Sequence, residues 1–456
     1  MRVHSNKFFL FIVALAAFIC AACAAQYPLN PKQEFLQEPE RDLEPAGHQL
    51  LIVSFSGGGT RAASLAYGTL EALRQIELPE RSGPGSEGPS RTMLDEISVI
   101  FSVSGGSFTA AYYGLYGKQI FDDYREKFLT RDVQGELRHR FLNPLHWPRL
   151  WSPRFGRSDL AQEYYDEILF HGATLADMER GSSPHVAILA TDMTDGIAIP
   201  FTRSGFRLIC SDFTKFPVAR AVAASSAVPG PLSPVILKNY AGSCGLEKPD
   251  WIRRALEQSD PTSRKYQMAK SINTYLDHRQ KPYFHLVDGG VSDNLGVRAI
   301  LDKIMIKGGL REALENAEAA GIRRIAFIIV DAEVSAKPSW SLGDIPESGT
   351  VLDVSSTVMV NKYNFEMLDL LRRTIKDWQT EDAARLKPLD FYIVHVTFDS
   401  LPGKKDQDYF HSIPTTLSLS AEQVDRLREV AATLLWGSPE FQRLVRDMGG
   451  NIPSQP

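Results

Sequence analysis

A serine flanked by small residues is the first feature of this sequence that can do chemistry. Ser104 is the central residue of Ser-Val-Ser-Gly-Gly at 102–106. The largely apolar, β-branched residues 96–101 predict a buried strand, and residues 108–116 can form a helix that packs on a sheet. A serine at such a strand-to-helix turn fits the nucleophile elbow G-x-S-x-G, with Ser102 in place of the first glycine. Taken alone, the same pentapeptide also describes a turn that ends a core strand.

A glycine-rich loop earlier in the chain can bind negative charge. Residues 50–55 read as a strand and lead into a loop that opens a predicted helix. The loop glycines are Gly57, Gly58 and Gly59. Backbone amides at the start of a helix point outward without partners, which is what an oxyanion hole requires. The pattern is also typical of a dinucleotide site, with Glu77 or Glu80 as its acidic residue, but that alternative gives Ser104 no role.

A third segment completes a pattern with the serine turn and the glycine-rich loop. Residues 283–287 read as a strand that ends in Asp288, followed by two glycines. Together with Ser104 and the glycine-rich loop, this segment resembles the patatin-like phospholipase family. Residues 188–196 and 223–230 look like two further family segments in the family's order. The resemblance covers the chain from about His48 to Asn294.

The resemblance implies a fold and a reaction. The fold is α/β, with three layers and a mainly parallel central sheet. By resemblance, Ser104 is the nucleophile, Asp288 is the base that contacts it directly, and Gly57, Gly58 and Gly59 form the oxyanion hole. The implied enzyme is a carboxylic ester hydrolase that cleaves acyl esters of phospholipids or lysophospholipids through an acyl-enzyme, without a cofactor. The sequence contains no H-E-x-x-H motif and no acidic calcium loop, so no metal is expected.

Other residues compete for the supporting roles. Asp192 ends a predicted strand and is a rival base. His395 belongs to a late strand, in the Ser…Asp…His order of an α/β-hydrolase triad. Arg61 follows the glycines and steadies the loop, attracts a phosphate headgroup, or is an ordinary surface arginine.

Two other functions stay open at this stage. One is a non-catalytic lipid-binding or envelope-scaffold lipoprotein that keeps the fold. Such a protein has no need for Ser104, Asp288 and three loop glycines together. The other is a serine hydrolase that acts on different acyl donors, including proteins or thioesters.

The composition of the chain is that of an ordinary globular protein, with 456 residues, 43% hydrophobic and 23% charged. Its formal net charge of −5 gives no support for nucleic-acid binding, which favours a basic face. We divide the chain into four parts. They are a signal peptide at 1–23, a polar tether at 24–47, a catalytic domain at 48–300, and a C-terminal α/β part at 301–456 that completes and covers the core.

The N-terminus has the features of an export signal. Two basic residues precede an apolar run at 8–19 that is too short to span a bilayer comfortably. Ala-Ala-Cys at 21–23 resembles the end of a bacterial lipobox, which implies lipidation of Cys23 and anchoring in the cell envelope, with outer-membrane sorting. Cleavage by the ordinary signal peptidase is the alternative, and it gives a periplasmic or secreted protein.

The body of the chain contains two further cysteines, Cys210 and Cys244. An oxidising compartment allows them to pair. The sequence does not set the distance between them, so two unpaired cysteines remain an equal alternative.

One segment has an unusual mixture of aromatic and basic residues. Residues 141–159 include Trp147 and Trp151 among several other apolar side chains, three arginines and three prolines. Rings beside cations suit a bilayer interface, where arginine meets phosphate. A cap that buries these rings over the core is the competing interpretation.

Overall fold

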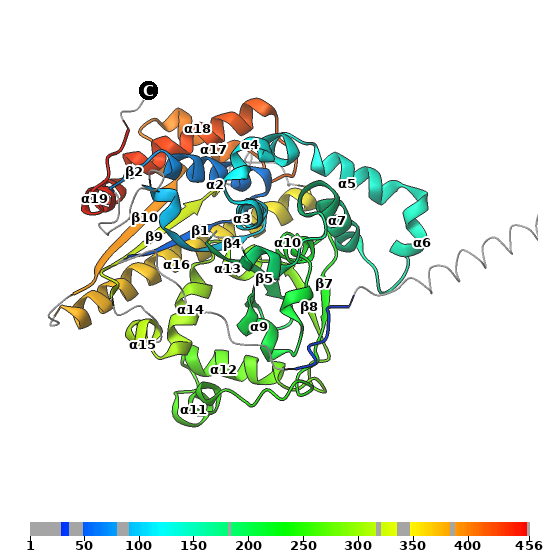
Figure 1. Cartoon of the computed structure of the whole chain (residues 1–456). Coiled ribbons are helices and arrows are strands. Elements are labelled where there is room, and N and C mark those ends of the chain that lie inside the picture. Colours follow the sequence, from blue (N-terminus) through cyan, green and yellow to red (C-terminus); the bar gives the residue numbers. More distant parts are fainter. Residues whose placement is uncertain are drawn as a thin grey trace, which may run out of the picture.

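An eight-stranded sheet forms the centre of the part of the chain that the structure describes (Figure 1). The computed structural model describes residues 29–35, 49–79, 91–180, 184–315, 321–334, 347–383 and 388–453. The hydrogen-bonded strand order is β10-β9-β1-β4-β5-β8-β7, and β6 pairs with β5 off this path. The strands are β1 (Gln49–Phe55), β4 (Ile97–Val103), β5 (His185–Asp192), β6 (Ile197–Phe201), β7 (Val235–Lys238), β8 (Tyr283–Asp288), β9 (Arg324–Asp331) and β10 (Asp390–Thr397), with β2 (Glu77–Leu78) and β3 (Arg91–Thr92) in a separate ribbon.

The sheet is mainly parallel. β10, β9, β1, β4 and β5 all run in one direction, whereas β6 and β8 run antiparallel to β5. β1 and β4 are buried at every residue. Parallel strands that are covered on both faces need such near-continuous apolar runs, which is why the sequence marks them so clearly. The predicted α/β fold with a mainly parallel central sheet is confirmed.

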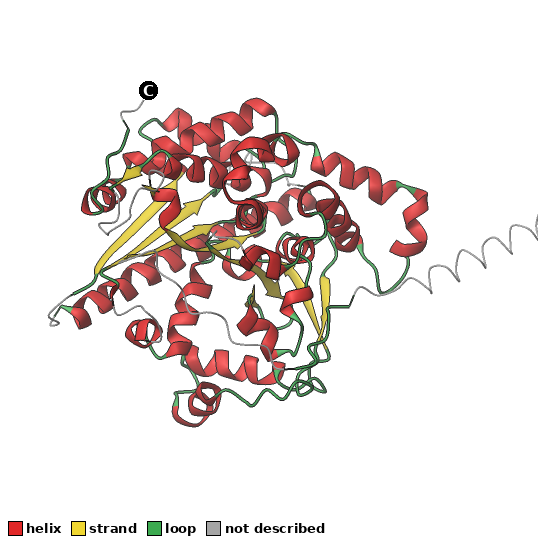
Figure 2. Cartoon of the chain, viewed as in Figure 1, coloured by secondary structure: helices red, strands yellow, loops and turns green. Residues whose placement is uncertain are grey.

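Helices cover both faces of the sheet (Figure 2). They are α2 (Gly59–Arg74), α3 (Gly105–Tyr116), α4 (Ile120–Tyr124), α5 (Val133–Leu142), α6 (Trp147–Leu150), α7 (Arg157–Tyr165), α8 (Leu175–Arg180), α9 (Arg203–Leu208), α10 (Val218–Ser225), α11 (Asp250–Gln258), α12 (Arg264–Tyr275), α13 (Gly290–Asp293), α14 (Val297–Lys307), α15 (Leu310–Glu315), α16 (Ser348–Asp382), α17 (Lys404–Ser412), α18 (Ala421–Gly437) and α19 (Pro439–Asp447). None of these helices is both long and apolar enough to cross a membrane.

Alternate side chains of β1 enter two separate cores, because successive residues of a strand face opposite ways. Val53 and Phe55 join the larger core, which includes residues of α2, α3 and α18. Leu50 and Ile52 join a smaller core with residues of α14 and α16. The molecule therefore has three layers, and in Figure 1 α2 and α18 lie above the sheet while α14 and α16 lie below it.

The last third of the chain supplies central elements rather than an appendage. β9 pairs with β1 along the full length of β1, and β10 pairs with β9. On the other side, α18 packs along α2, the helix that the glycine-rich loop opens. The strand that leads into the glycine-rich loop is thus held between β4 and a strand from residues 324–331.

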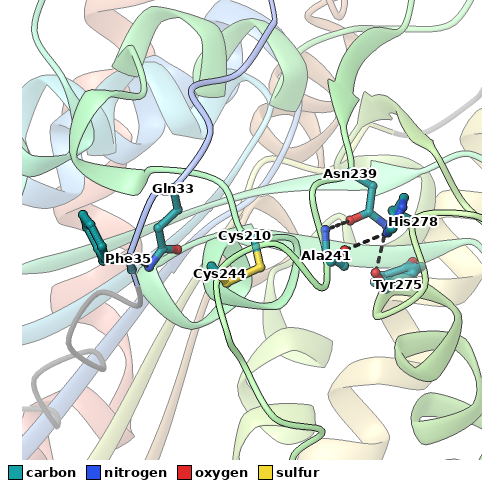
Figure 3. The surroundings of a disulfide bond; sticks show 8 residues. All are labelled: Gln33, Phe35, Cys210, Asn239, Ala241, Cys244, Tyr275 and His278. Carbon is teal, nitrogen blue, oxygen red and sulfur yellow. Dashed lines mark hydrogen bonds between the residues drawn. A yellow bond between two sulfur atoms is a disulfide. The ribbon is translucent and has the colours of Figure 1, made fainter.

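A segment near the N-terminus is bound to the body. The main chain of Gln33 donates to the carbonyl of Cys210 (2.9 Å), and the Asn30 amide donates to the hydroxyl of Ser211 (2.8 Å). Cys210 is itself joined to Cys244 by a disulfide, the pairing that the sequence left open (Figure 3). Residues 29–35 of the predicted tether therefore pack on the body. Cys23 and the predicted signal peptide lie outside the described residues.

Candidate active site

Ser104 stands at a sharp turn between β4 and α3. Its backbone has φ 49° and ψ −118°, a conformation that residues with a Cβ rarely adopt. The following glycines are required by close contacts: a Cβ on Gly105 would lie 2.1 Å from the carbonyl oxygen of Gly59, and one on Gly106 would lie 2.7 Å from the Cβ of Phe55. The turn thus has the geometry of the nucleophile elbow that the sequence predicts.

The hydroxyl of Ser104 donates a 2.7 Å hydrogen bond to Oδ2 of Asp288. The main-chain N–H of Gly290 donates to the other carboxylate oxygen at 2.8 Å, which fixes the orientation of the group. Burial raises the pKa of Asp288 from 3.8 to about 6, although the bonds from Ser104 and Gly290 lower it in part. A carboxyl group with this pKa changes its protonation state near neutral pH, as a general base must.

Ser225, at the end of α10, stabilises the turn through hydrogen bonds. Its Oγ accepts from the main-chain N–H of Ser104 (2.9 Å) and donates to the carbonyl of Leu189 on β5 (2.6 Å). The same oxygen lies 2.9 Å from the hydroxyl of Ser107. Sequence reasoning assigned no role to Ser225, although a hydroxyl within a helix of alanine and valine was an available signal.

The glycine-rich loop passes directly beside Ser104. A Cβ on Gly57 would lie 3.3 Å from the Cβ of Ser104 and 2.5 Å from Oδ1 of Asn294, so a side chain there would press on Ser104 and displace the Asn294 amide. Gly58 and Gly59 have φ of 139° and 62°, which favour glycine. The loop therefore lies directly against the turn that carries the serine.

The three loop glycines do not offer equivalent amides. The N–H of Gly57 donates to the carbonyl of Asn294 at 3.1 Å, so the predicted donor role of Gly57 is replaced by a role in close packing. Among the described residues, the amides of Gly58 and Gly59 donate to no backbone carbonyl. The amide of Gly105, the first residue of α3, is a further candidate donor, because elbow motifs commonly use the residue after the serine; sequence reasoning did not name it.

Arg61 is buried and holds the loop in place. Its guanidinium donates to the carbonyls of Ala332 (2.8 Å) and Ile413 (2.7 Å) and to the hydroxyl of Thr415 (3.1 Å). Burial lowers the pKa of Arg61 to about 10, while the nearby charge of Asp331 raises it. Arg61 is therefore not a surface arginine, and because its donors face the protein interior its contacts favour loop support over binding of a headgroup.

The two rival residues have other partners. Asp192 is buried and forms an ion pair with Lys281, and the hydroxyl of Tyr275 donates to it at 2.8 Å. His395 lies on β10, which β9 and β1 separate from β4, and its Nε2 is 3.2 Å from Asp331. Neither residue contacts Ser104. Within the described ranges, no group of three or more His, Cys, Asp or Glu side chains is arranged to hold a metal ion.

Comparison with known proteins agrees with the fold. The model of the family described as patatin-like phospholipase matches residues 53–301, which is more than half of the chain. The chain belongs to the patatin-like phospholipase family, and this membership supports lipid acyl hydrolysis as its general activity.

Two solved structures with similarity to the chain are human GIVD cytosolic phospholipase A2 and VipD from Legionella pneumophila. The first is 12% identical with a TM-score of 0.38, and the match covers 95% of this chain and 66% of that longer one. The second is 11% identical with a TM-score of 0.24, covering 90% of this chain and 72% of that one. A search of curated sequences found no match.

Proposed function

We propose that this protein is a serine acyl hydrolase that cleaves acyl esters of phospholipids or lysophospholipids, with Ser104 as nucleophile and Asp288 as its base. The observation that carries the proposal is the 2.7 Å contact between the Ser104 hydroxyl and Asp288, formed at a strained turn. A serine hydroxyl becomes an effective nucleophile only when a neighbouring base takes its proton. The substrate class comes from the family, because the described residues do not identify a headgroup.

The reaction begins when ionised Asp288 takes the proton of Ser104 as the serine oxygen attacks the ester carbonyl. The resulting oxyanion accepts hydrogen bonds from the amides of Gly58 and Gly59, assisted by that of Gly105. Each such donor typically lowers the barrier by about 3–4 kcal/mol. Asp288 then returns the proton to the departing alcohol oxygen, which leaves an acyl-enzyme. Asp288 then takes a proton from water as the water oxygen attacks the acyl carbonyl. The C–Oγ bond breaks to release the fatty acid, and the proton on Asp288 passes to the Ser104 oxygen, which restores the serine.

A bilayer surface is the partner that we propose for the arm formed by α5, α6, the turn between them and Trp151, which follows α6. Leu142, Leu145 and Trp151 are 66%, 82% and 61% exposed, and the arm stands away from the sheet in Figure 1. Phe155, from the same aromatic segment, is instead buried. Part of the segment therefore packs inward and part presents apolar side chains to solvent, and the exposed part supports the proposed bilayer contact.

We also propose export to the cell envelope with lipidation of Cys23, most simply at the outer membrane. This proposal rests on the sequence of residues 8–23. The Cys210–Cys244 disulfide supports export, because such bonds persist in oxidising compartments.

Labelling with a fluorophosphonate probe tests the nucleophile and the base together. We expect wild-type protein to be labelled, Ser104→Ala to be unlabelled, and Asp288→Asn to be labelled much more slowly. Ser292→Ala, which changes a half-buried serine close to Asp288, is the matched control and should label normally. Failure of the folded wild-type protein to react would favour the scaffold function. Reaction with the probe but not with phospholipid or lysophospholipid vesicles would favour other acyl donors.

A further inference from the structure

The side chain of Asn294, which directly follows α13, has no structural role. The neighbouring residue Asp293 caps α14, because its carboxylate accepts from the main-chain N–H groups of Arg298 (3.1 Å) and Ala299 (2.9 Å). The main chain of Asn294 is held in place, since its carbonyl accepts from the N–H of Gly57 at 3.1 Å. Its half-buried side-chain amide, by contrast, forms no hydrogen bond within the part of the chain that the structure describes. Polar groups in a folded protein normally have a partner, so this amide can serve a reactant.

The side-chain oxygen of Asn294 lies beside both members of the proposed dyad. A Cβ built on Gly57 would lie 2.5 Å from Oδ1 of Asn294 and 3.3 Å from the Cβ of Ser104. A Cβ built on Gly290 would lie 3.0 Å from the same amide oxygen and 3.1 Å from Oδ1 of Asp288. A glycine is therefore all that stands beside the amide oxygen on the side of each catalytic residue.

Gly290 leaves room for a small molecule between the two oxygens. Its φ is not positive, so the backbone conformation does not require glycine at this position. What the missing side chain provides is space, because a methyl group there would lie 3.0 Å from the Asn294 oxygen and 3.1 Å from the Asp288 oxygen. Two acceptors at such distances from one point can both accept from a single small donor placed near it.

The donor that suits this place is water. An amide oxygen only accepts hydrogen bonds, and neither oxygen of an ester carries a hydrogen. Water carries two, and the second half of the proposed reaction needs a water molecule beside Asp288. With one hydrogen directed at Asp288 and the other at Asn294, both O–H directions of that water are fixed, which is the positioning that a reacting group requires. A free hydroxyl of a lysophospholipid is the other donor among the proposed substrates.

We propose that Asn294 is a catalytic residue for hydrolysis of the acyl-enzyme, where its side-chain oxygen accepts one hydrogen of the attacking water. This inference rests on the proposed function. Asp288 takes the other hydrogen as a proton while the water oxygen bonds to the acyl carbon. The bond between that carbon and Oγ of Ser104 then breaks, and Oγ takes the proton from Asp288. The fatty acid leaves with the hydrogen that Asn294 accepted.

Burst kinetics with p-nitrophenyl hexanoate separate the two halves of the reaction. The burst of nitrophenol reports formation of the acyl-enzyme, and the steady state reports its hydrolysis. Asn294→Leu keeps the size of the side chain and removes the acceptor. We expect its burst rate and its fluorophosphonate labelling to be unchanged, and its steady-state rate to fall about tenfold to a hundredfold, as when a reacting group is misplaced. Mass spectrometry of the intact protein should show the hexanoyl-enzyme accumulating.

Two further variants complete the test. Gly290→Ala fills the space between the two oxygens but retains the N–H that donates to Asp288, so it should slow the same step without slowing the burst. It also decides the proposal if Asn294→Leu does not fold. Asn273→Leu on α12, which changes another half-buried asparagine, is the matched control and should behave as the wild type.

Each other outcome overturns a defined part of the proposal. Steady-state rates equal to the wild type in Asn294→Leu and Gly290→Ala would refute the role of Asn294. Burst and labelling slowed as much as the steady state would place Asn294 in the fold or in the first half-reaction. A higher KM for lysophospholipid with unchanged hydrolysis of the acyl-enzyme would assign the amide to a substrate hydroxyl. A wild-type protein that gives neither burst nor labelling would overturn the hydrolase itself, so the two failures are distinguishable.

Discussion

Ser104 and Asp288 meet across β5, which lies between their two strands and pairs with both. Val103 on β4 pairs with Leu189 of β5, while Asp288 on β8 pairs with the next residue, Ala190. β4 runs parallel to β5 and β8 runs antiparallel to it, so the serine and the aspartate reach the same level from opposite directions. Their 2.7 Å contact therefore depends on the register of three strands.

The rate of ester hydrolysis should rise with pH as Asp288 loses its proton. Because burial raises the pKa of Asp288 to about 6, kcat/KM for a soluble ester should be low at pH 5 and increase to a plateau above roughly pH 7. The measurement is a pH–rate profile of the intact protein. A rising limb near the ordinary aspartate value of 3.8 would show that the carboxyl is not buried during catalysis.

Asp288→Asn should be much less active but more stable than the wild type at pH 8. The folded state binds the Asp288 proton more tightly than the unfolded state, so ionisation lowers the free energy of unfolding as pH rises from about 4 to about 6. The shift corresponds to about 3 kcal/mol. The asparagine variant has no carboxyl to ionise. We expect its free energy of unfolding to exceed that of the wild type by on the order of 1–3 kcal/mol at pH 8, and the difference to vanish at pH 4.

Urea unfolding at the two pH values measures this difference. Asp260→Asn is the control. Hydrogen bonds from Thr262 lower the pKa of this exposed carboxyl, so replacing it with asparagine should not raise the free energy of unfolding at pH 8. An Asp288→Asn protein that is less stable than the wild type at pH 8 would contradict the prediction.

The backbone strain at Ser104 can be measured by comparing two substitutions at one position. With φ at 49°, Ser104→Gly should be more stable than Ser104→Ala by about 1 kcal/mol, because glycine adopts this conformation without a Cβ penalty. At Ser107, inside α3, the order should reverse, since glycine is typically about 0.5–1 kcal/mol worse than alanine there. The same order at both positions would mean that the turn is unstrained.

Much of this architecture could be predicted from the sequence because the parallel strands are apolar at nearly every position. The elbow serine and the glycine-rich loop each follow such a strand, and Asp288 ends the antiparallel strand β8, whose last residues are also buried. The role of Ser225 was missed because its partners, Ser104 and Leu189, are distant in the chain.

The sequence did not show that the Gly57 amide already has a hydrogen-bond partner, again because that partner is distant in the chain. The Gly57 amide is satisfied by the carbonyl of Asn294, more than two hundred residues away. The pairing of Cys210 with Cys244 likewise depends on a Cα–Cα distance of 5.6 Å that no sequence pattern fixes.

Vesicle binding should depend on the exposed side chains of the α5–α6 arm. Leu145→Ser with Trp151→Ser removes two of its most exposed apolar groups, and we expect at least a tenfold loss of binding to anionic vesicles, from about 1.5–3 kcal/mol per fully buried side chain. Co-sedimentation measures it. Met359→Ser with Phe365→Ser on α16, each 66% exposed, is the matched control. Hydrolysis of a soluble ester should stay unchanged, and a greater loss in the control pair would move the docking surface to α16.

The Cys210–Cys244 disulfide should stabilise the body and the bound N-terminal segment together. Its 34-residue separation predicts a contribution of about 3–4 kcal/mol from the restricted unfolded chain. Cys210→Ser with Cys244→Ser should lower the urea midpoint accordingly and speed proteolysis near residues 29–35, which contact Cys210. Wild-type protein with and without reductant is the control. An unchanged midpoint would show that the loop is already ordered in the unfolded state.

The position of β9 beside β1 has a consequence for how the protein is made. β1 ends at residue 55, but its neighbour on one side is not complete until residue 331. At about 5–20 residues per second, roughly 15–55 s of synthesis separate the two strands. Throughout that interval one apolar edge of β1 has no native partner, and such an edge readily pairs with other chains. The central sheet can therefore be completed only late in synthesis. Until then the unpaired edge of β1 must be protected from other chains.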